Sequence, residues 1–287
     1  MAEKTLKHQK KKTEGKKIEG ENTHLKRRVH DFWNTTPCGT FLAKHEEGTL
    51  EYFKEIDRLR YHSYPYSYSY LLKVAGFDKY RGKRVLEIGC GVGTDLSQFA
   101  KNGALVTGVD LTESAIKLAK RRFKAMRLKG TLRVADAERL PFPSNSFDLV
   151  YSFGVLHHTP NTQKAMNEVY RVLKPGGTAR IMLYHTISFE YLILLLRKII
   201  NPSRWKWSVQ EAINYETEMN RNARGPTNPL TKTYTARSAK KFFGKFSSVR
   251  TKVYWIRIPK IGRYVPEFLT YPASRVVGWH LIIEAVK

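Results

Sequence analysis

Short apolar runs alternate with helix-periodic stretches from residue 84 to about residue 184, and this alternation is the strongest constraint on the fold. It predicts strands joined by helical crossovers, and therefore a parallel sheet of the α/β class. Helical spacing of apolar residues begins at about Thr94, after Thr112, which can cap a helix, and after Thr162. Strands are expected at residues 84–88, 104–109, 132–135, 147–153 and 178–184, a short helix at 236–243, and late strands near 252–258 and 276–286.

A glycine-rich turn, Glu87-Ile88-Gly89-Cys90-Gly91-Val92-Gly93, joins the first of these strands to a helix. Glycines at the carboxyl end of a parallel strand let the backbone approach a ligand closely. A dinucleotide fingerprint would need its third glycine at Thr94, and no P-loop lysine follows, so neither a dinucleotide nor a nucleoside triphosphate is favoured. Tight packing of strand against helix is the alternative explanation for such a turn.

Two aspartates follow the next two strands. Asp110 ends the second strand, 21 residues after Gly89 (110 − 89), where a carboxylate can accept hydrogen bonds from two ribose hydroxyls. Asp136 follows the third strand, where a carboxylate can accept from an exocyclic amine such as that of adenine. Either aspartate alone could cap a turn or a helix. The glycine turn and both aspartates together, in this order, favour a site for an adenosyl group.

The chain resembles the class I S-adenosylmethionine-dependent methyltransferases, in particular the type 11 group, which is similar to the quinone-biosynthesis methyltransferases. This resemblance implies an S-adenosyl-L-methionine cofactor and a Rossmann-like, seven-stranded, mostly parallel sheet of order 3-2-1-4-5-7-6 with one antiparallel strand. It rests on the motifs at residues 85–93, 108–112, 135–142, 146–150, 155–158 and 173–177.

The resemblance also implies which residues bind the cofactor. The methionine end would lie against the glycines of the turn with support from Glu87, the adenosine against both aspartates and their neighbours, and the methyl group beside the end of the fourth strand. In chain order these residues are Glu87, Gly89, Gly91, Gly93, Asp110, Leu111, Asp136, Ala137, Ser152 and Phe153.

Catalysis of this kind demands little of the protein, because a sulfonium is already an activated methyl donor. A general base is needed where the acceptor must lose a proton. Candidates are His157, His158, Tyr184 and His185, all expected at the carboxyl edge of the fourth and fifth strands; packing of the loop is the alternative role of the two adjacent histidines. Histidines and cysteines do not cluster, so no metal is expected.

Charge and composition indicate partners for the chain and its division into an arm, a cap and a methyltransferase domain. Lys and Arg total 51 against 25 Asp and Glu, giving a net charge of +26, so RNA or an anionic membrane surface is a plausible partner. Residues 1–25 are rich in lysine and poor in apolar side chains, which predicts a disordered basic arm. Residues 26–80 are expected to form a helical, tyrosine-rich cap, and residues 81–287 the methyltransferase domain, with an insertion at about 186–230.

Two segments outside the core bear on the acceptor. Tyr61, Tyr64, Tyr66, Tyr68 and Tyr70 could wall a flat acceptor, stack bases, or pack the cap onto the sheet. The insertion begins with an apolar stretch at residues 189–198 and continues to two tryptophans, which suits an interfacial helix, a lid or a core helix.

Cellular location follows from weak signals. The chain shows neither a signal peptide nor a run of roughly 20 apolar residues, and its two cysteines, Cys38 and Cys90, fit a reducing compartment. A cytoplasmic location is expected, or a peripheral one at the membrane.

The leading interpretation is a methyltransferase acting on a small or lipid-like metabolite. An RNA methyltransferase is the alternative, although no Asn-Pro-Pro-Tyr type motif for base-amine methylation is present. A non-catalytic RNA- or membrane-binding protein on the same fold is the third reading, and the intact glycine turn and both aspartates count against it.

Overall fold

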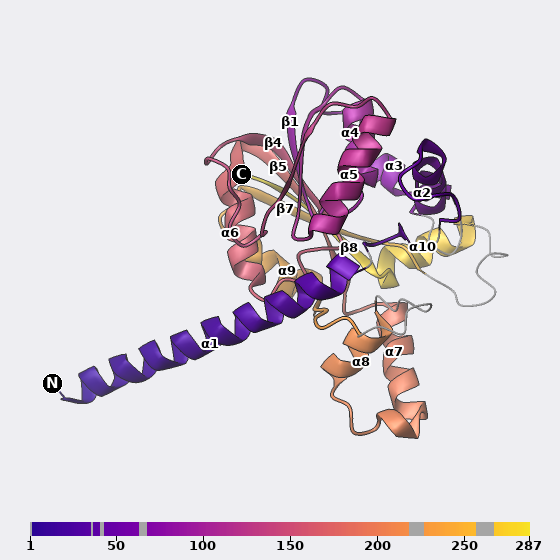
Figure 1. Ribbon diagram of the computed structural model, residues 1–287. Coiled ribbons are helices and arrows are strands. Elements are labelled where there is room, and N and C mark those ends of the chain that lie inside the picture. The colour runs from indigo at the N-terminus through magenta and orange to yellow at the C-terminus, as the bar shows by residue number, and fades with distance from the viewer. Residues whose placement is uncertain (1, 36, 41–42, 63–67, 218–226, 257–266) are drawn as a thin grey trace.

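The computed structural model describes residues 2–35, 37–40, 43–62, 68–217, 227–256 and 267–287, with backbone alone at 2–18 and 267–270 (Figure 1). Its centre is a sheet in the order β3-β2-β1-β4-β5-β8-β7, in which β1 to β5 are parallel and β8 is antiparallel to both neighbours. The predicted class and strand order are confirmed, and a two-residue strand, β6, is added beside β5. The strands are β1 (Arg84–Ile88), β2 (Leu105–Asp110), β3 (Thr131–Val134), β4 (Phe147–Phe153), β5 (Leu173–His185), β6 (Thr233–Tyr234), β7 (Ser248–Tyr254) and β8 (His280–Val286).

Side chains of the central strands alternate between two hydrophobic cores, one on each face of the sheet. Leu149 of β4 belongs to the core under α4 (Thr94–Lys101) and α5 (Glu113–Ala125), whereas Val150 belongs to the core under α6 (Thr162–Val172). Because strands buried on both faces read as continuous apolar runs, these segments were recognisable in the sequence. The short predicted helix is also present, as α9 (Ala236–Lys240) and the 3-10 turn η3 (Lys241–Phe243).

The last two long strands differ in their bounds from the prediction. The strand expected near 252–258 begins at Ser248 and ends at Tyr254, and residues 257–258 lie outside the described part. The strand expected from residue 276 begins at His280, because α10 (Glu267–Val277) occupies the preceding residues. This helix packs on β7, where the Arg275 guanidinium lies 4.2 Å from the Tyr254 ring centroid and donates to the Val253 carbonyl. Its β-branched end, Val276-Val277, resembles a strand locally, and tertiary packing decides otherwise.

Residues 1–25, the expected basic arm, fall within helix α1 (Ala2–Thr35), which extends away from the body in Figure 1. Lysine, glutamate and glutamine all favour helix, a preference that the low apolar content of the segment concealed. Val29, near the other end of α1, is 5% exposed. Two shorter helices follow, α2 (Leu50–His62) and α3 (Leu71–Val74).

The insertion after β5 folds as a separate helical pair that projects from the body in Figure 1. It comprises α7 (Phe189–Ile200), the 3-10 turn η2 (Pro202–Arg204) and α8 (Val209–Glu216). The two helices pack through a small cluster of Leu194, Ala212 and Ile213, so α7 is not a core helix of the domain. Across the described residues, no helix combines the length and the apolar character needed to span a bilayer.

Candidate active site

A cavity of about 220 Å³ opens at the carboxyl ends of β1, β2, β3, β4 and β5. One wall is built by the loops that follow these strands. The opposite wall comes from the N-terminal helices and the segment between them, through Lys26, Val29, Trp33, Cys38 and Arg60. The sheet edge therefore forms the floor of a site that the N-terminal cap covers.

The three glycines of the turn have different roles in the structure. A Cβ at Gly89 (φ +71°) would fall 2.2 Å from a methyl of Val155, so close packing excludes any side chain there. Gly93 (φ +78°) is the N-cap residue of α4 and lies outside the cavity lining. Gly91 (φ +51°) lines the cavity, and a Cβ there would meet nothing within 4 Å. Packing thus explains Gly89, while Gly91 leaves space that a ligand can fill.

Asp110 is held rigidly at the end of β2. One carboxylate oxygen accepts from the Gly91 N–H at 3.0 Å, and the other accepts from the Thr112 N–H at 3.0 Å and the Thr112 hydroxyl at 2.8 Å. Thr112 has the extended backbone of an N-cap residue, but its hydroxyl serves Asp110 instead of the helix. Burial raises the pKa of Asp110, although the hydrogen bonds from these donors oppose the rise. A carboxylate has about four acceptor sites, so Asp110 can still accept from a ligand beside Leu111, which also lines the cavity.

Glu87 carries a buried polar atom without a partner. Its Oε2 has no hydrogen bond within the described part of the chain, although Glu87 lines the cavity and is 4% exposed. Burial raises the pKa of Glu87 well above its ordinary value, with Asp95 and Asp110 adding to the effect. Such orphaned atoms are rare in native proteins. A ligand bearing an ammonium group would satisfy it, so the residues present fit a methionine-like end.

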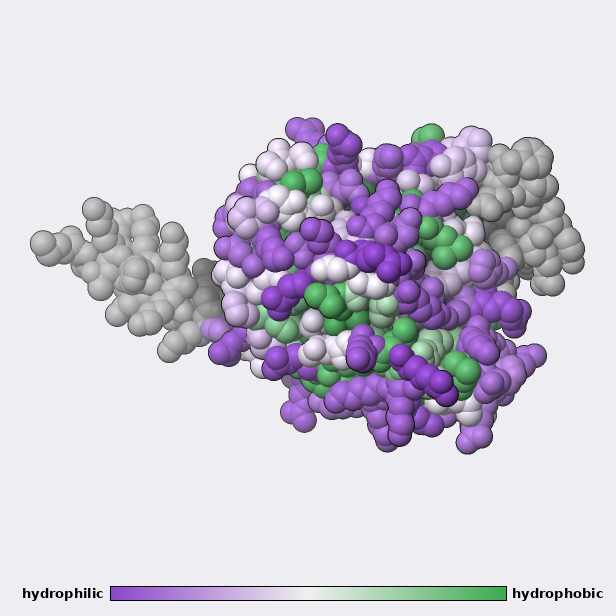
Figure 2. Space-filling view, turned by 90° about the horizontal axis from the view of Figure 1, so that it is seen from above, coloured by the Kyte–Doolittle hydropathy of each residue, from purple (hydrophilic) through white to green (hydrophobic). Residues whose placement is uncertain are grey.

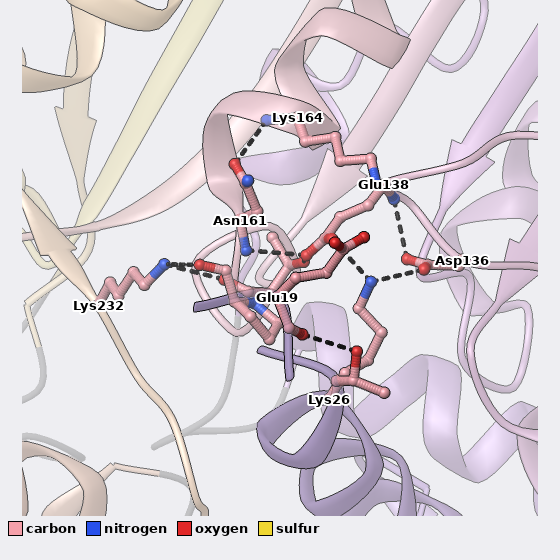
Figure 3. A network of polar contacts seen from close by, with 10 residues as sticks. Glu19, Lys26, Asp136, Glu138, Asn161, Lys164 and Lys232 are labelled. Atoms are coloured by element: carbon pink, nitrogen blue, oxygen red, sulfur yellow. Dashed lines mark hydrogen bonds and ion pairs between the residues drawn. The ribbon is translucent and has the colours of Figure 1, made fainter. Parts of the chain in front are cut away.

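Asp136 and Ala137 line the cavity after β3, and Asp136 already has partners. Its Oδ1 accepts from the Glu138 N–H at 2.9 Å, and its Oδ2 accepts from the Lys26 ammonium at 2.7 Å. Figure 3 shows Lys26 reaching from α1 to both Asp136 and Glu138. Glu138 also accepts from the Asn161 N–H, so this carboxylate joins the loops after β3 and β4.

Sequence reasoning missed an ion pair at the other end of the cavity. Arg60 of α2 donates through Nε and Nη2 to the two oxygens of Asp95, which also accepts from the Tyr61 and Tyr151 hydroxyls. The Arg60 guanidinium lies 5.0 Å from the Phe153 ring centroid. Arg60 also lines the cavity. The position of Asp95, directly after Gly93-Thr94 of the glycine turn, could have indicated that Asp95 lies at the site. Nothing in the sequence around Arg60 indicated the same for Arg60.

The four candidate bases separate clearly. His158 and Tyr184 line the cavity, whereas His157 and His185 do not. The His157 ring is fully buried, 4.0 Å from the Tyr184 ring centroid, and burial lowers the pKa of His157 well below its ordinary value. Burial also lowers the pKa of His185, whose Nδ1 lies 3.2 Å from the Gly278 carbonyl. His158 Nδ1 lies 2.6 Å from the Leu230 carbonyl, so Nδ1 carries the proton and a neutral ring has its lone pair on Nε2.

Two more predicted groups, the pair Ser152 and Phe153 and the tyrosine stretch, have some members in the cavity lining and others behind it. Phe153 lines it, but the Ser152 hydroxyl is buried behind it and donates to the Ile88 carbonyl at 2.9 Å. Of the tyrosine stretch, Tyr68 lines the cavity, while Tyr61 and Tyr70 are buried in the core beneath it. Residues 64 and 66 lie outside the described residues. The stretch therefore both packs the cap and walls the site.

Chemistry at this site relies on carboxylates, a guanidinium and the His158 imidazole, which is buried in the cavity wall. No group of three or more His, Cys, Asp or Glu side chains suited to a metal occurs in the described ranges. Lys26, Trp33 and Cys38 were missed as lining residues because nothing in the local sequence distinguishes the inner face of α1 and the segment after it.

Comparison with known proteins adds a family and a fold. Residues 86–181 match the family model of a methyltransferase domain. The chain is 34% identical to the ubiquinone biosynthesis O-methyltransferase of Coxiella burnetii over 127 residues, 41% of this chain and 54% of that relative. It is 36% identical to the sterol 4-C-methyltransferase strm-1 of Caenorhabditis elegans over 94 residues, 32% of this chain and 28% of that relative. The match thus spans about half the length of the first of these relatives, and less of the second.

Solved structures share the fold at low identity. Magnesium protoporphyrin IX methyltransferase from Synechocystis, with bound S-adenosylhomocysteine, has a TM-score of 0.56 at 16% identity, covering 90% of this chain and 98% of that one. Phosphoethanolamine N-methyltransferase 2 from Haemonchus contortus has a TM-score of 0.57 at 20% identity, covering 90% of this chain and 60% of that one.

Proposed function

We propose that this chain, which carries a class I methyltransferase domain of the type 11 group at residues 86–181, is an S-adenosylmethionine-dependent methyltransferase with a small, lipid-like acceptor. The observation that carries the proposal is the convergence of Glu87, Gly91 and Asp110 on one cavity at the sheet edge. They offer an unpartnered carboxyl oxygen, an open backbone approach and a fixed carboxylate, which suit an amino acid joined to a nucleoside.

Named residues would hold the cofactor in this cavity. Asp110 would accept from the ribose hydroxyls, with Leu111 against the adenine, and Asp136 with Ala137 would meet the adenine amine. At the other end, Glu87 would face the amino group, and the Arg60 guanidinium would meet the carboxylate. When bound, S-adenosylmethionine supplies a methyl group on a positively charged sulfur. The chain itself orients the two reactants and excludes water between them.

Aromatic side chains support a flat or lipid-like acceptor. Trp33, Tyr68, Phe153 and Tyr184 line the cavity together with His158. The names of the two relatives, which concern ubiquinone biosynthesis and a sterol, support the same kind of acceptor. An RNA acceptor has less support. The names of the same two relatives mention no nucleic acid, and the sequence has no Asn-Pro-Pro-Tyr type motif for methylation of a base amine.

Calorimetric titration with S-adenosylhomocysteine tests the proposal. The wild-type protein should bind saturably, and Asp110→Asn should weaken binding at least about ten-fold, because it loses charge-assisted acceptors for the ribose. Asp148→Asn is the matched control, since Asp148 pairs with Lys174 outside the cavity lining. Absence of binding by the folded wild-type protein would overturn the proposal. Transfer of labelled methyl groups to a lipid extract, compared with total RNA, then distinguishes the acceptors.

His158 is the proposed general base for acceptors that must lose a proton. Its tautomer leaves Nε2 as the basic nitrogen, and the ring lies in the cavity wall 5.4 Å from the Trp33 ring. His158→Gln should lower kcat while S-adenosylhomocysteine affinity stays unchanged. A kcat equal to that of the wild type would contradict this role.

The proposal includes peripheral binding at an anionic membrane. It is supported by the α7 tip, meaning the exposed side of α7 and the turn that follows it to Trp205. One side of this tip consists of large apolar residues with exposed fractions between 42% and 76%: Leu192, Leu196, Ile199, Ile200 and Trp205. Trp205 is fixed there because its indole N–H donates to the Ile199 carbonyl at 2.7 Å. The face in Figure 2, turned away from α7 and α8, is mainly hydrophilic with apolar residues interspersed.

Charge at the α7 tip suits anionic lipid. Glu216 is neutralised by Arg197 and Arg204, which leaves Lys198 and Lys206 beside the apolar side chains. Tryptophan, isoleucine and lysine together are typical of interfacial segments. In co-sedimentation, the wild-type protein should bind vesicles containing phosphatidylglycerol, and the double variant Ile199→Ser, Ile200→Ser should not. Equal binding by both proteins would contradict the assignment to this tip.

A further inference from the structure

The outer wall of the cavity is one face of α1. Lys26, Val29 and Trp33 recur at spacings of three and four residues and all line the cavity. The Trp33 ring lies against His158, in the loop after β4. A ligand in this cavity is therefore enclosed between the sheet edge and α1.

The same helix is fastened to α5, on the ribose side of the cavity. His30 Nε2 lies 2.9 Å from a carboxylate oxygen of Glu113, and the Asn34 side-chain oxygen accepts from the Ser114 N–H at 3.0 Å. Glu113 and Ser114 directly follow the Asp110-Leu111-Thr112 segment that would hold the ribose. These contacts attach α1 close to one half of the adenosine site.

Lys26 fastens the helix on the adenine side. Its ammonium lies 2.7 Å from Asp136 Oδ2 and 2.7 Å from Glu138 Oε2 (Figure 3). Glu138 is 5% exposed, so removal of the lysine would leave a buried carboxylate without its cation. Burial lowers the pKa of Lys26, but the hydrogen bonds and charges of the two carboxylates together outweigh this effect and raise it. This contact is therefore a charged bond at neutral pH.

We propose that Lys26 is a positioning residue that latches α1 over the bound cofactor and sets how fast the cofactor exchanges. The inference rests on the proposed function, because it takes Asp136 as the acceptor for the adenine amine. An ammonium has three donors and a carboxylate about four acceptor sites, so Lys26 and the amine can share Asp136. The latch and the bound adenine then support each other. Release requires α1 to separate from Asp136 and Glu138.

Stopped-flow tryptophan fluorescence of S-adenosylhomocysteine binding and release tests the latch. Lys26→Met keeps the aliphatic stem and removes the charge, and it should raise the dissociation rate about ten-fold, equivalent to about 1.4 kcal/mol. The association rate should rise as well, because α1 opens more often. Lys26→Arg should restore slow release, since a guanidinium can bridge the same two carboxylates. Lys101→Met, which removes a more exposed ion pair with Asp57, should match the wild type.

Hydrogen exchange in residues 19–35 supplies a second readout. In the wild-type protein, S-adenosylhomocysteine should slow exchange in this segment, and in Lys26→Met that protection should be smaller. A release rate unchanged by Lys26→Met would overturn the latch. So would a lower Kd of that variant, because it would mean that Lys26 competes with the adenine amine. If the folded wild-type protein does not bind at all, the proposed function fails along with the latch, whereas binding with unchanged exchange kinetics contradicts the latch alone.

Discussion

Replacement of Gly91 by alanine separates the role of a ligand-facing glycine from that of a turn glycine. Gly91 has φ +51° and lines the cavity, and its N–H donates to Asp110. An alanine in the left-handed region costs about 1–2 kcal/mol relative to glycine. Since nothing lies within 4 Å of the new methyl, the empty protein pays no further steric penalty. The melting temperature should therefore fall by a few °C.

The bound state behaves differently, because the methyl group would enter space that the proposed cofactor fills. Overpacking of one methyl group costs about 1–3 kcal/mol, so affinity for S-adenosylhomocysteine should fall by about 5- to 150-fold. Gly176→Ala is the matched control, with φ +73° and nothing within 4 Å of its Cβ, outside the cavity lining. Both variants should lose similar stability in thermal unfolding. Calorimetry that finds equal affinity in Gly91→Ala and Gly176→Ala would refute the reasoning.

Two further predictions concern stability. Asp95→Ala should lower the free energy of unfolding in urea by about 3 kcal/mol, because Asp95 is 1% exposed and its loss leaves Arg60 unpaired; a loss below about 1 kcal/mol, the range of an exposed ion pair, would argue against this. His30→Gln should lower stability at pH 5.5 but not at pH 9. The contacts of His30 with Asp31 and Glu113 raise the pKa of His30, so its contribution is full below pH 6.5 and is lost as the pH rises through the folded-state value. Equal effects at both pH values would contradict that assignment.

The sequence was informative where structure follows from local pattern. The match of residues 86–181 to a methyltransferase domain confirms the resemblance drawn from the motifs. The strands themselves were predicted, because parallel strands buried on both faces leave continuous apolar runs that helices separate. Their order came from the resemblance to class I methyltransferases. Asp110 could be expected at the sheet edge for the same reason, since it directly ends a strand.

Contacts between distant segments were not predictable in this way. Lys26 and Asp136 are 110 positions apart, and Arg60 and Asp95 are 35 apart. Each arginine or lysine sits in a helix with several other cations, and only tertiary packing selects the one that turns inward. Composition alone did not reveal helix α1, because a helix that one end anchors needs few apolar residues along the rest of its length.

Adjacent residues of one motif can have opposite roles, as His157 and His158 show. His157 is fully buried against Tyr184, and neither ring nitrogen has a hydrogen-bond partner in the described part of the structure, so burial keeps it neutral. His158 faces the cavity, and its tautomer is fixed by Leu230, at the end of the insertion. The insertion therefore does more than project a surface, since the chain that returns from it sets the proton position on the proposed base. A change in the α7 and α8 segment that displaces Leu230 would alter proton transfer without touching the cofactor residues.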